Sequence, residues 1–311
     1  MKNRLVFLCG ALRSGTSMTH LMLNSHPQIN NPGEFDFFFD LLSQKGTEPG
    51  VEEFFDYLST DRIFLSKNLR LDNNADNYAS VLQNFVEQLG KTKDKLCLNL
   101  HRNFDCAYTY FPDAKYIHLV RDPRDVARSS IGMGWAGNVY YGVKHWVDTE
   151  ESWQRLLPKL DKHQYTEIQF ENLVREPELN LANLCHLIDL SYEPCMLDYE
   201  NNSSYSKPDV SLINQWKKKL SERETELVEL RAGRLMRINS YPTTVNAPKE
   251  PSIIERLSLK IENTVHRERF SIGRYGLGLH LALRMTEKLG LKWLRKTTAS
   301  KSRAIIKKHL K

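Results

Sequence analysis

A buried strand, a glycine loop and a helix start follow one another within the first 25 residues, and no other feature constrains the fold as strongly. The run Leu5–Cys9 has the length and composition of a strand that is buried on both faces. Gly10 and Gly15 have the spacing of a Walker A phosphate loop, and apolar residues at helical spacing follow as far as His26. This order predicts an α/β fold with a ligand site at the carboxyl edge of its sheet.

The residues of the loop favour the binding of an anion. A helix that begins after Gly15 presents free N–H groups and the positive end of its dipole. Ser14, Thr16 and Ser17 add hydroxyl donors. The planar guanidinium of Arg13 can bind two anionic oxygens. Thr16 stands where a Walker A loop carries lysine, so the loop matches an ATPase poorly, and a plain strand-to-helix turn is the alternative.

A second strand-like run, residues 116–120, ends at another polar loop. Arg121 follows that run directly, and Ser129 lies about two helical turns beyond it. Because neighbouring strands lie ~4.8 Å apart, loops at the ends of two nearby strands can hold two separated phosphates of one nucleotide. The alternative is a helix start stabilised only by ion pairs, Arg121 with Asp125 or Arg124 with Asp122.

Together these motifs resemble the sulfotransferase family, over residues 1–245 and most closely in the branch of the tyrosylprotein and Golgi-type carbohydrate sulfotransferases. The resemblance implies that the loop from Arg13 to Ser17 binds the 5′-phosphosulfate of 3′-phosphoadenosine 5′-phosphosulfate (PAPS). It also implies that Arg121 and Ser129 bind the 3′-phosphate. We therefore expect residues 1–245 to form a catalytic domain.

Two further segments extend the resemblance. Residues 168–177 resemble the family's strand and the turn after it, with Phe170 in place of the usual tyrosine. Lys207, Trp216 and Lys217 resemble the late loop that closes over the nucleotide. The fold that the resemblance implies is a P-loop-like three-layer fold, in which helices flank a central parallel sheet.

The implied enzyme moves the sulfuryl group of PAPS to a hydroxyl of a saccharide or glycoconjugate and releases PAP without a metal. Sulfuryl transfer moves less charge than phosphoryl transfer, which accounts for the missing lysine. Protein tyrosine is the alternative acceptor. A P-loop kinase or NTPase is a weaker alternative because Thr16 stands in the lysine position. A nucleotide-binding protein without catalysis is a weaker alternative because Arg13 and the candidate base Glu34 are both present. We expect the acceptor to meet the variable loops at residues 35–74 and 132–144.

Two side chains are candidates for the base that takes the proton of the acceptor hydroxyl. Glu34 lies 21 positions after Arg13, among phenylalanines that would partly remove it from water, and its segment resembles the base-carrying segment of heparan-type sulfotransferases. Asp36 is the fallback. His101 ends an apolar strand, as the catalytic histidine of cytosolic sulfotransferases does, although it or Arg102 can instead steady the sulfate. Arg13 is expected to stabilise the charge on the leaving phosphate.

The C-terminal part of the chain differs in charge from the rest. Residues 251–311 hold 15 Lys and Arg against 4 Asp and Glu, a net charge of +11, whereas residues 1–250 carry −5. A proline-rich linker lies at residues 241–251. We therefore expect a basic helical extension over residues 246–311.

This extension contains an amphipathic pattern. Apolar residues at steps of four run beside a basic stripe: Leu281, Met285, Leu289 and Trp293, with Arg284, Lys288, Lys292, Arg295 and Lys296. Such a helix can lie on an anionic membrane surface, pack on the catalytic domain or join a second subunit. No stacking aromatics interleave the charges, so we expect no binding of nucleic acid.

Hydropathy and cysteine usage bear on where the protein works. No apolar run approaches the roughly 20 residues of a membrane span. The five cysteines lack metal-ligand spacing, and their odd number favours a reducing compartment. The phosphate loop begins so near residue 1 that we expect no signal peptide, and hence a cytoplasmic protein.

Overall fold

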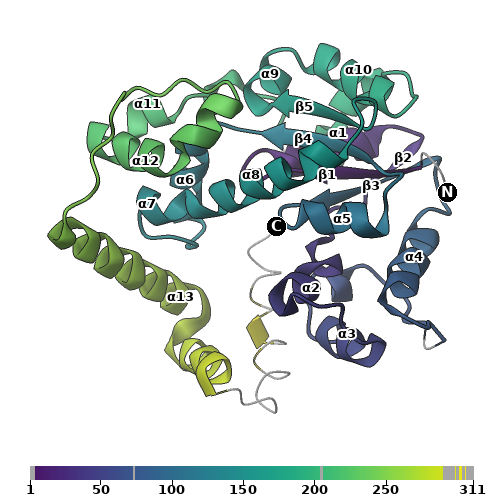
Figure 1. The fold of residues 1–311 in the computed structure, drawn as a ribbon, viewed down its shortest axis with the longest axis horizontal. Helices are drawn as coiled ribbons and strands as arrows, with labels where there is room; N and C mark the ends of the chain where they lie inside the picture. The colour runs from purple at the N-terminus through teal and green to yellow at the C-terminus, as the bar shows by residue number, and fades with distance from the viewer. Residues whose placement is uncertain are drawn as a thin grey trace.

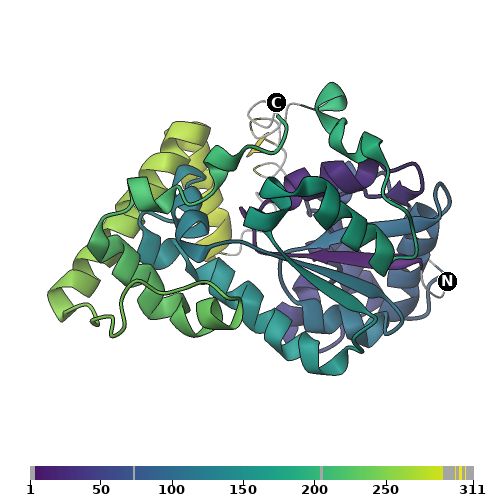
Figure 2. The same ribbon diagram turned by 90° about the horizontal axis from the view of Figure 1, so that it is seen from above.

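A parallel sheet of five strands lies at the centre of the protein (Figures 1 and 2). The computed structural model describes residues 4–72, 74–203 and 206–289, together with residues 298, 301, 302 and 305. The strand order is β2-β3-β1-β4-β5, and every neighbouring pair is parallel. The strands are β1 (Leu5–Cys9), β2 (Ile29–Asn30), β3 (Lys95–Leu100), β4 (Lys115–Val120) and β5 (Tyr165–Gln169).

The apolar runs become strands because both of their faces are covered. All five residues of β1 are buried, as are all six of β4. Cys9 pairs with Leu100 on one side and with His118 on the other, so β1 and β3 end at the same level and β4 runs two residues farther, to Val120. The loops that follow these strands therefore meet at one edge of the sheet, as the sequence predicts.

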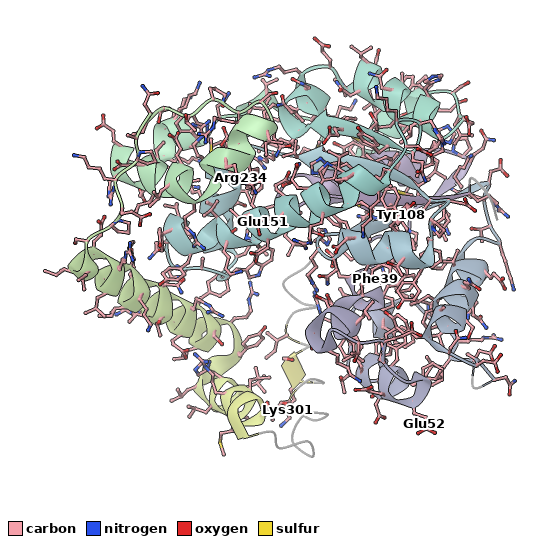
Figure 3. The ribbon with its side chains drawn as sticks, in the orientation of Figure 1. Phe39, Glu52, Tyr108, Glu151, Arg234 and Lys301 are labelled. Atoms are coloured by element: carbon pink, nitrogen blue, oxygen red, sulfur yellow. The ribbon has the colours of Figure 1, made fainter. Side chains whose placement is uncertain are left out.

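Helices cover both faces of the sheet, which confirms the expected three-layer α/β fold. On one face Val6 and Leu8 pack with α1, α9 and α10. On the other face Phe7 packs with α4, α5 and α8, and with buried phenylalanines that include Phe39, which lies between α2 and α5 (Figure 3). The helices on the two faces are α1 (Thr16–Ser25), α2 (Asp40–Lys45), α3 (Val51–Leu58), α4 (Tyr78–Leu89), α5 (Phe104–Tyr110), α8 (Lys144–Leu156), α9 (Phe170–Arg175) and α10 (Pro177–Leu187).

The remaining helices gather at one end of the sheet. Val126 of α6 and Val139 of α7 share a small apolar core with Val228 of α12. Residues 239–252 then lead from α12 to the long helix α13. These elements are α6 (Pro123–Gly132), α7 (Val139–Gly142), α11 (Trp216–Lys219), α12 (Glu222–Ile238) and α13 (Ile253–Leu289).

α13 is a kinked helix that stands apart from the sheet and docks on the loop between α6 and α7 (Figure 1). The kink is at Gly276, whose φ of 74° and ψ of 158° are not helical. A Cβ on Gly134 would lie 2.0 Å from the ring of Phe270, and one on Gly137 would lie 2.5 Å from the Cα of Asn263. α13 therefore packs directly against these two glycines of the expected acceptor loop.

The predicted extension falls only partly within the described residues. The expected linker and a long C-terminal helix are both present, and the division at residue 245 stays a prediction. Leu281, Arg284 and Met285 belong to α13. The backbones of Lys288 and Leu289 belong to it too, whereas the remaining residues of the predicted pattern lie outside the described residues: Lys292, Trp293, Arg295 and Lys296.

The substitution Gly10→Ala tests how closely the loop packs on the sheet. A Cβ at residue 10 would lie 2.5 Å from the carbonyl oxygen of Leu119 in β4, so we expect a loss of about 1–3 kcal/mol in the free energy of unfolding. Urea unfolding should give a lower midpoint with an unchanged slope. Gly273→Ala in α13 is the control, because no atom lies within 4 Å of its new Cβ. A wild-type midpoint for Gly10→Ala would contradict the packing described.

Candidate functional site

The loop between β1 and α1 adopts the strained turn that its glycines predict. Arg13 and Gly15 both have positive φ, 73° and 95°. Gly15 cannot carry a side chain, because a Cβ there would lie 2.3 Å from the ring of Phe170. α1 then begins at Thr16, so its first N–H groups face the loop.

Ser14 gives the most direct sign that the loop binds an anion. Its side chain is fully buried, and its Oγ has no hydrogen-bond partner among the residues that the structure describes. Leaving a buried hydroxyl unpaired costs free energy. Thr16 is also buried, whereas Ser17 and Arg13 are exposed beside it. A phosphate or phosphosulfate oxygen at this helix start would satisfy Ser14.

The two predicted phosphate-binding motifs meet at this edge of the sheet. Arg13 donates a hydrogen bond from Nε to the Oγ of Ser129 at 2.9 Å. Arg121 donates from Nη1 to the backbone oxygen of Arg13 at 3.2 Å. Pro123 occupies the first turn of α6 and Asp122 caps it, which sets the direction of the helix that carries Ser129.

Arg121 is held between an aromatic ring and the late loop. Its guanidinium lies over the ring of Phe170, 4.3 Å from the centroid, and its Nη2 donates to the oxygen of Leu212 at 2.6 Å. The ion pair considered as an alternative also forms, at 3.7 Å from Asp125. The Nε of Arg121 is nevertheless buried without a hydrogen-bond partner among the described residues, so donor capacity remains for a ligand.

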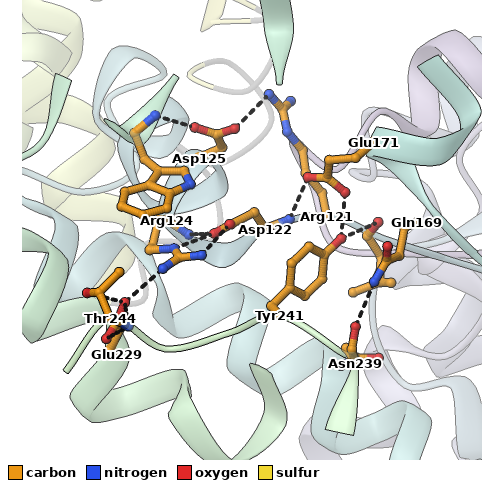
Figure 4. A network of polar contacts seen from close by, with 12 residues as sticks. Arg121, Asp122, Arg124, Asp125, Gln169, Glu171, Glu229, Asn239, Tyr241 and Thr244 are labelled. Carbon is orange, nitrogen blue, oxygen red and sulfur yellow. Dashed lines mark hydrogen bonds and ion pairs between the residues drawn. The ribbon is translucent and has the colours of Figure 1, made fainter. Parts of the chain in front are cut away.

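A buried charge network supports this loop from behind (Figure 4). Arg124 pairs with Asp122 at 2.7 Å and with Glu229 at 2.8 Å, and it lies 3.7 Å from the centroid of the Trp216 ring. The backbone N–H of Trp216 donates to Asp125 at 2.7 Å. Trp216 is therefore buried as part of the scaffold that holds the Arg121 loop.

The other two residues of the predicted late loop lie on the surface. Lys217 is exposed, and its Nζ lies 5.6 Å from the centroid of the Trp216 ring. Lys207 is exposed and forms an ion pair with Glu200 at 3.2 Å. Roles of Lys207, Trp216 and Lys217 in binding the nucleotide stay predictions.

His101 is fixed by an aspartate that the sequence suggested only as a fallback base. Asp36 accepts hydrogen bonds from the backbone N–H and the Nδ1 of His101, both at 2.7 Å. The Nε2 of His101 lies 3.3 Å from the hydroxyl of Thr16 at the start of α1. No local pattern in the sequence indicates this pair, because Asp36 and His101 lie 65 positions apart and meet at the end of β3.

Electrostatics favour the charged forms of both side chains in this pair. Burial works against the imidazolium, but the charge of Asp36 and its hydrogen bond outweigh burial and raise the pKa of His101. Burial likewise works against the carboxylate, but His101 and Arg102 bring the pKa of Asp36 below its ordinary value. Arg102 itself is bound to Asp40 through two hydrogen bonds of 2.6 and 2.5 Å.

Glu34 extends the edge of the sheet beside this pair. It forms a parallel bridge with Asn99 of β3, and Phe35 and Gly33 exchange backbone hydrogen bonds with Asn99 at 2.9 Å. No hydrogen bond or ion pair holds its carboxylate within the described part of the chain. Glu34 lies within electrostatic reach of His20, Lys67 and His101. The carboxylate is thus free to take a proton.

Comparison with known proteins decides the family. Residues 6–194 match the model of the "Sulfotransferase family". The chain belongs to the sulfotransferase family. The expected family is thereby confirmed, whereas the expected branch is not resolved, and the activity and the co-substrate PAPS stay predictions.

Solved sulfotransferases share the fold. The sulfotransferase domain of the Synechococcus PCC 7002 olefin synthase is 19% identical, with a TM-score of 0.59 over 78% of this sulfotransferase and 97% of that domain. The sulfotransferase domain of the curacin biosynthetic pathway is 20% identical, with a TM-score of 0.54 over 77% and 98%. At these identities the likeness supports the fold only.

One curated relative is an "Uncharacterized protein" of Aquifex aeolicus (strain VF5). It is 28% identical over 223 residues, which are 63% of this chain and 27% of the relative. The chain thus spans about a quarter of the length of that curated relative.

The substitution Asp36→Asn tests the pair with His101 through the pH dependence of stability. The raised pKa of His101 stabilises the fold fully below the ordinary value of 6.5, and this contribution is lost as the pH rises through the pKa in the folded protein. The lowered pKa of Asp36 contributes above 3.8 and is lost as the pH falls through its value in the folded protein. Between these values we expect a loss of about 3 kcal/mol in the variant.

Urea unfolding of both proteins at pH 5.5 and at a pH near 9 measures this difference. The gap between wild type and Asp36→Asn should shrink at the higher pH. Asp113→Asn, on an exposed turn, is the control and should show no such trend. A gap that is the same at both pH values would mean that His101 is not charged by Asp36.

Proposed function

We propose that this sulfotransferase moves the sulfuryl group of PAPS to a hydroxyl of a saccharide or glycoconjugate, with Glu34 as the base. The contact of Arg13 with Ser129 is the observation that carries the proposal. It joins the loop suited to a 5′-phosphosulfate with the helix suited to a 3′-phosphate. One nucleotide with anionic groups at both ends fits that arrangement better than ATP does.

The donor set fits each end of PAPS. At the 5′ end, the start of α1 and the unpaired hydroxyl of Ser14 offer donors to the phosphosulfate. At the 3′ end, Ser129 and the unpaired Nε of Arg121 offer donors to the phosphate. Arg13 lies between the sites for the two ends of PAPS and can stabilise the charge that develops on the leaving phosphate.

Each group has one task in the reaction. The acceptor oxygen attacks sulfur, a new S–O bond forms, and the bond between sulfur and the 5′-phosphate oxygen breaks. The proton of the acceptor hydroxyl passes to the carboxylate of Glu34, and PAP leaves with the electron pair of the broken bond. Asp36 favours the charged form of His101 beside Thr16, which suits His101 to steady the transferring sulfate rather than to take the proton.

A saccharide acceptor is supported by an exposed aromatic side chain near the loop. Trp135 is exposed, and its ring meets the ring of His145 edge to face at 5.9 Å between centroids. His145 in turn bonds the oxygen of Leu12 in the phosphate loop at 3.0 Å. An exposed indole at this place can stack on a sugar ring. Protein tyrosine stays the alternative acceptor.

The location and partners of the enzyme stay predictions. In the described part of the chain, no helix is long and apolar enough to cross a membrane. A cytoplasmic protein that touches a membrane or associates with itself through its C-terminal helix remains our expectation. The kinase, NTPase and non-catalytic alternatives lack a supporting observation at the loop.

The substitution Glu34→Gln tests the base. We expect turnover to fall by about 10²–10⁴-fold, because the amide cannot take the proton. Stabilisation of the protein by PAP in a thermal-shift assay should be retained, and ATP with magnesium should give no comparable shift. Glu52→Gln is the matched control, because Glu52 lies on the outer side of α3 (Figure 3).

Two results would contradict this proposal in different ways. Stabilisation by ATP with magnesium but not by PAP would overturn PAPS as the donor. Wild-type turnover in Glu34→Gln would leave the donor intact and make His101 or Asp36 the base.

The substitution Ser129→Ala tests the 3′-phosphate site. A hydrogen bond to a charged group is lost, so we expect the affinity for PAP to fall about tenfold or more. The affinity for AMP, which lacks the 3′-phosphate, should change little. Isothermal titration with both nucleotides measures the ratio, with Ser130→Ala as the control, since the buried Ser130 bonds only the backbone of its own helix. Equal losses for PAP and AMP would contradict the assignment.

A further inference from the structure

The first leg of α13 carries a row of large apolar side chains that face solvent. We call this row the α13 stripe; it consists of Ile254, Leu257, Ile261, Val265 and Ile272. Their exposed fractions run from 82% at Ile254 to 37% at Ile272. Exposed apolar rows of this length are uncommon on soluble surfaces and mark sites of interaction.

The α13 stripe lies on one face of the helix. Its members follow one another at steps of three, four, four and seven residues, which return to the same side at 3.6 residues per turn. The opposite side is already occupied. Asn263 accepts from the backbone N–H of Gly137 at 2.8 Å, and Phe270 covers Gly134. Docking on the protein therefore turns the α13 stripe outward.

The charges beside the α13 stripe are basic. Arg256, Lys260 and Arg267 are exposed on the same leg. Its acidic residues are each engaged within the protein: Glu255 with Arg223 at 2.8 Å, Glu262 with Asn138 at 3.0 Å, and Glu268 with His280 at 2.8 Å and with Arg284. Arg256 pairs with Glu250 at 2.7 Å, whereas Lys260 and Arg267 form no ion pair within the described part of the chain, so these two basic side chains stay available.

We propose that α13 lies on the surface of a membrane that contains anionic lipids, with the α13 stripe in the headgroup region. An apolar face with a basic flank is the pattern of a helix that lies in the plane of a membrane interface. The +11 charge of residues 251–311 complements such a surface. A second copy of this chain fits less well, because two facing stripes would bring like-charged flanks together.

The second leg of α13 also exposes apolar side chains. After the kink at Gly276, the side chains of Leu277, Leu281 and Met285 are again exposed at steps of four. The contacts of Glu268 with His280 and Arg284 hold the second leg against the first. Both legs therefore offer apolar side chains to an outside partner.

Vesicle sedimentation with the full-length protein tests the proposal. The vesicles contain phosphatidylcholine with or without about 30% phosphatidylglycerol. We expect the protein to sediment with the anionic vesicles only, and to be released by about 0.5 M NaCl. Lys260→Gln should weaken this partition about fivefold, and Lys260→Gln with Arg267→Gln further. Lys91→Gln and Lys162→Gln, exposed near the amino ends of β3 and β5, are the charge-matched controls.

The variant Ile254→Ser with Ile261→Ser tests the apolar part. We expect it to lose vesicle binding while its melting temperature and its stabilisation by PAP stay at wild-type values, because both side chains are exposed. Leu179→Ser, at an exposed leucine on α10, is the apolar control. Equal binding of this double variant and wild type, or no binding of wild type to anionic vesicles, would overturn the proposal. So would a wild-type dimer in analytical ultracentrifugation that the double variant dissociates, since it would identify a second copy as the partner.

Discussion

The close packing of Phe170 against Gly15 governs the geometry of the whole carboxyl edge. One face of the ring fills the space where a side chain of residue 15 would stand, and the guanidinium of Arg121 lies over the ring. A single aromatic side chain thus fixes the spacing between the two anion-binding loops. The usual tyrosine of the family would add only a hydroxyl to this contact. Phenylalanine in its place keeps the aromatic ring, which sets the distance between Gly15 and Arg121.

Buried charged side chains hold the loop that carries Arg121 in place. Asp122, Arg124 and Glu229 form a chain of short ion pairs under Trp216. Such pairs contribute little net stability when their desolvation is counted, but removing one partner is costly. In this protein they restrict the start of α6 to a single conformation. Arg121 and Ser129 flank this buried network, so it also fixes their positions.

The sequence predicted those parts of the site that short-range rules control. The strand, the glycine turn and the start of α1 follow from a few neighbouring residues, and so does the polar loop that follows β4. The pair of Asp36 with His101 could not be predicted, because β3 brings the two residues together across 65 positions. The glycines at 134 and 137 were assigned to an acceptor loop, since nothing local indicates that α13 would pack on them.

The bridge between Glu34 and Asn99 holds the proposed base on the sheet, apart from the loops that we propose to meet the acceptor. Glu34 is held through its backbone, as an added residue of the sheet, and the side chains of Asn31 and Lys67 hold the turn before it through Gly33 and Pro32. The segments that follow it, from residue 41 to residue 72, form short helices and turns, and Phe54, Leu58 and Phe64 anchor them in the main hydrophobic core. In the reaction that we propose, exchanging the exposed side chains of these segments would change which acceptor fits while Glu34 keeps its place. A sheet edge built in this way would lend itself to diversification, because new acceptors would require new loops and no new site for sulfuryl transfer.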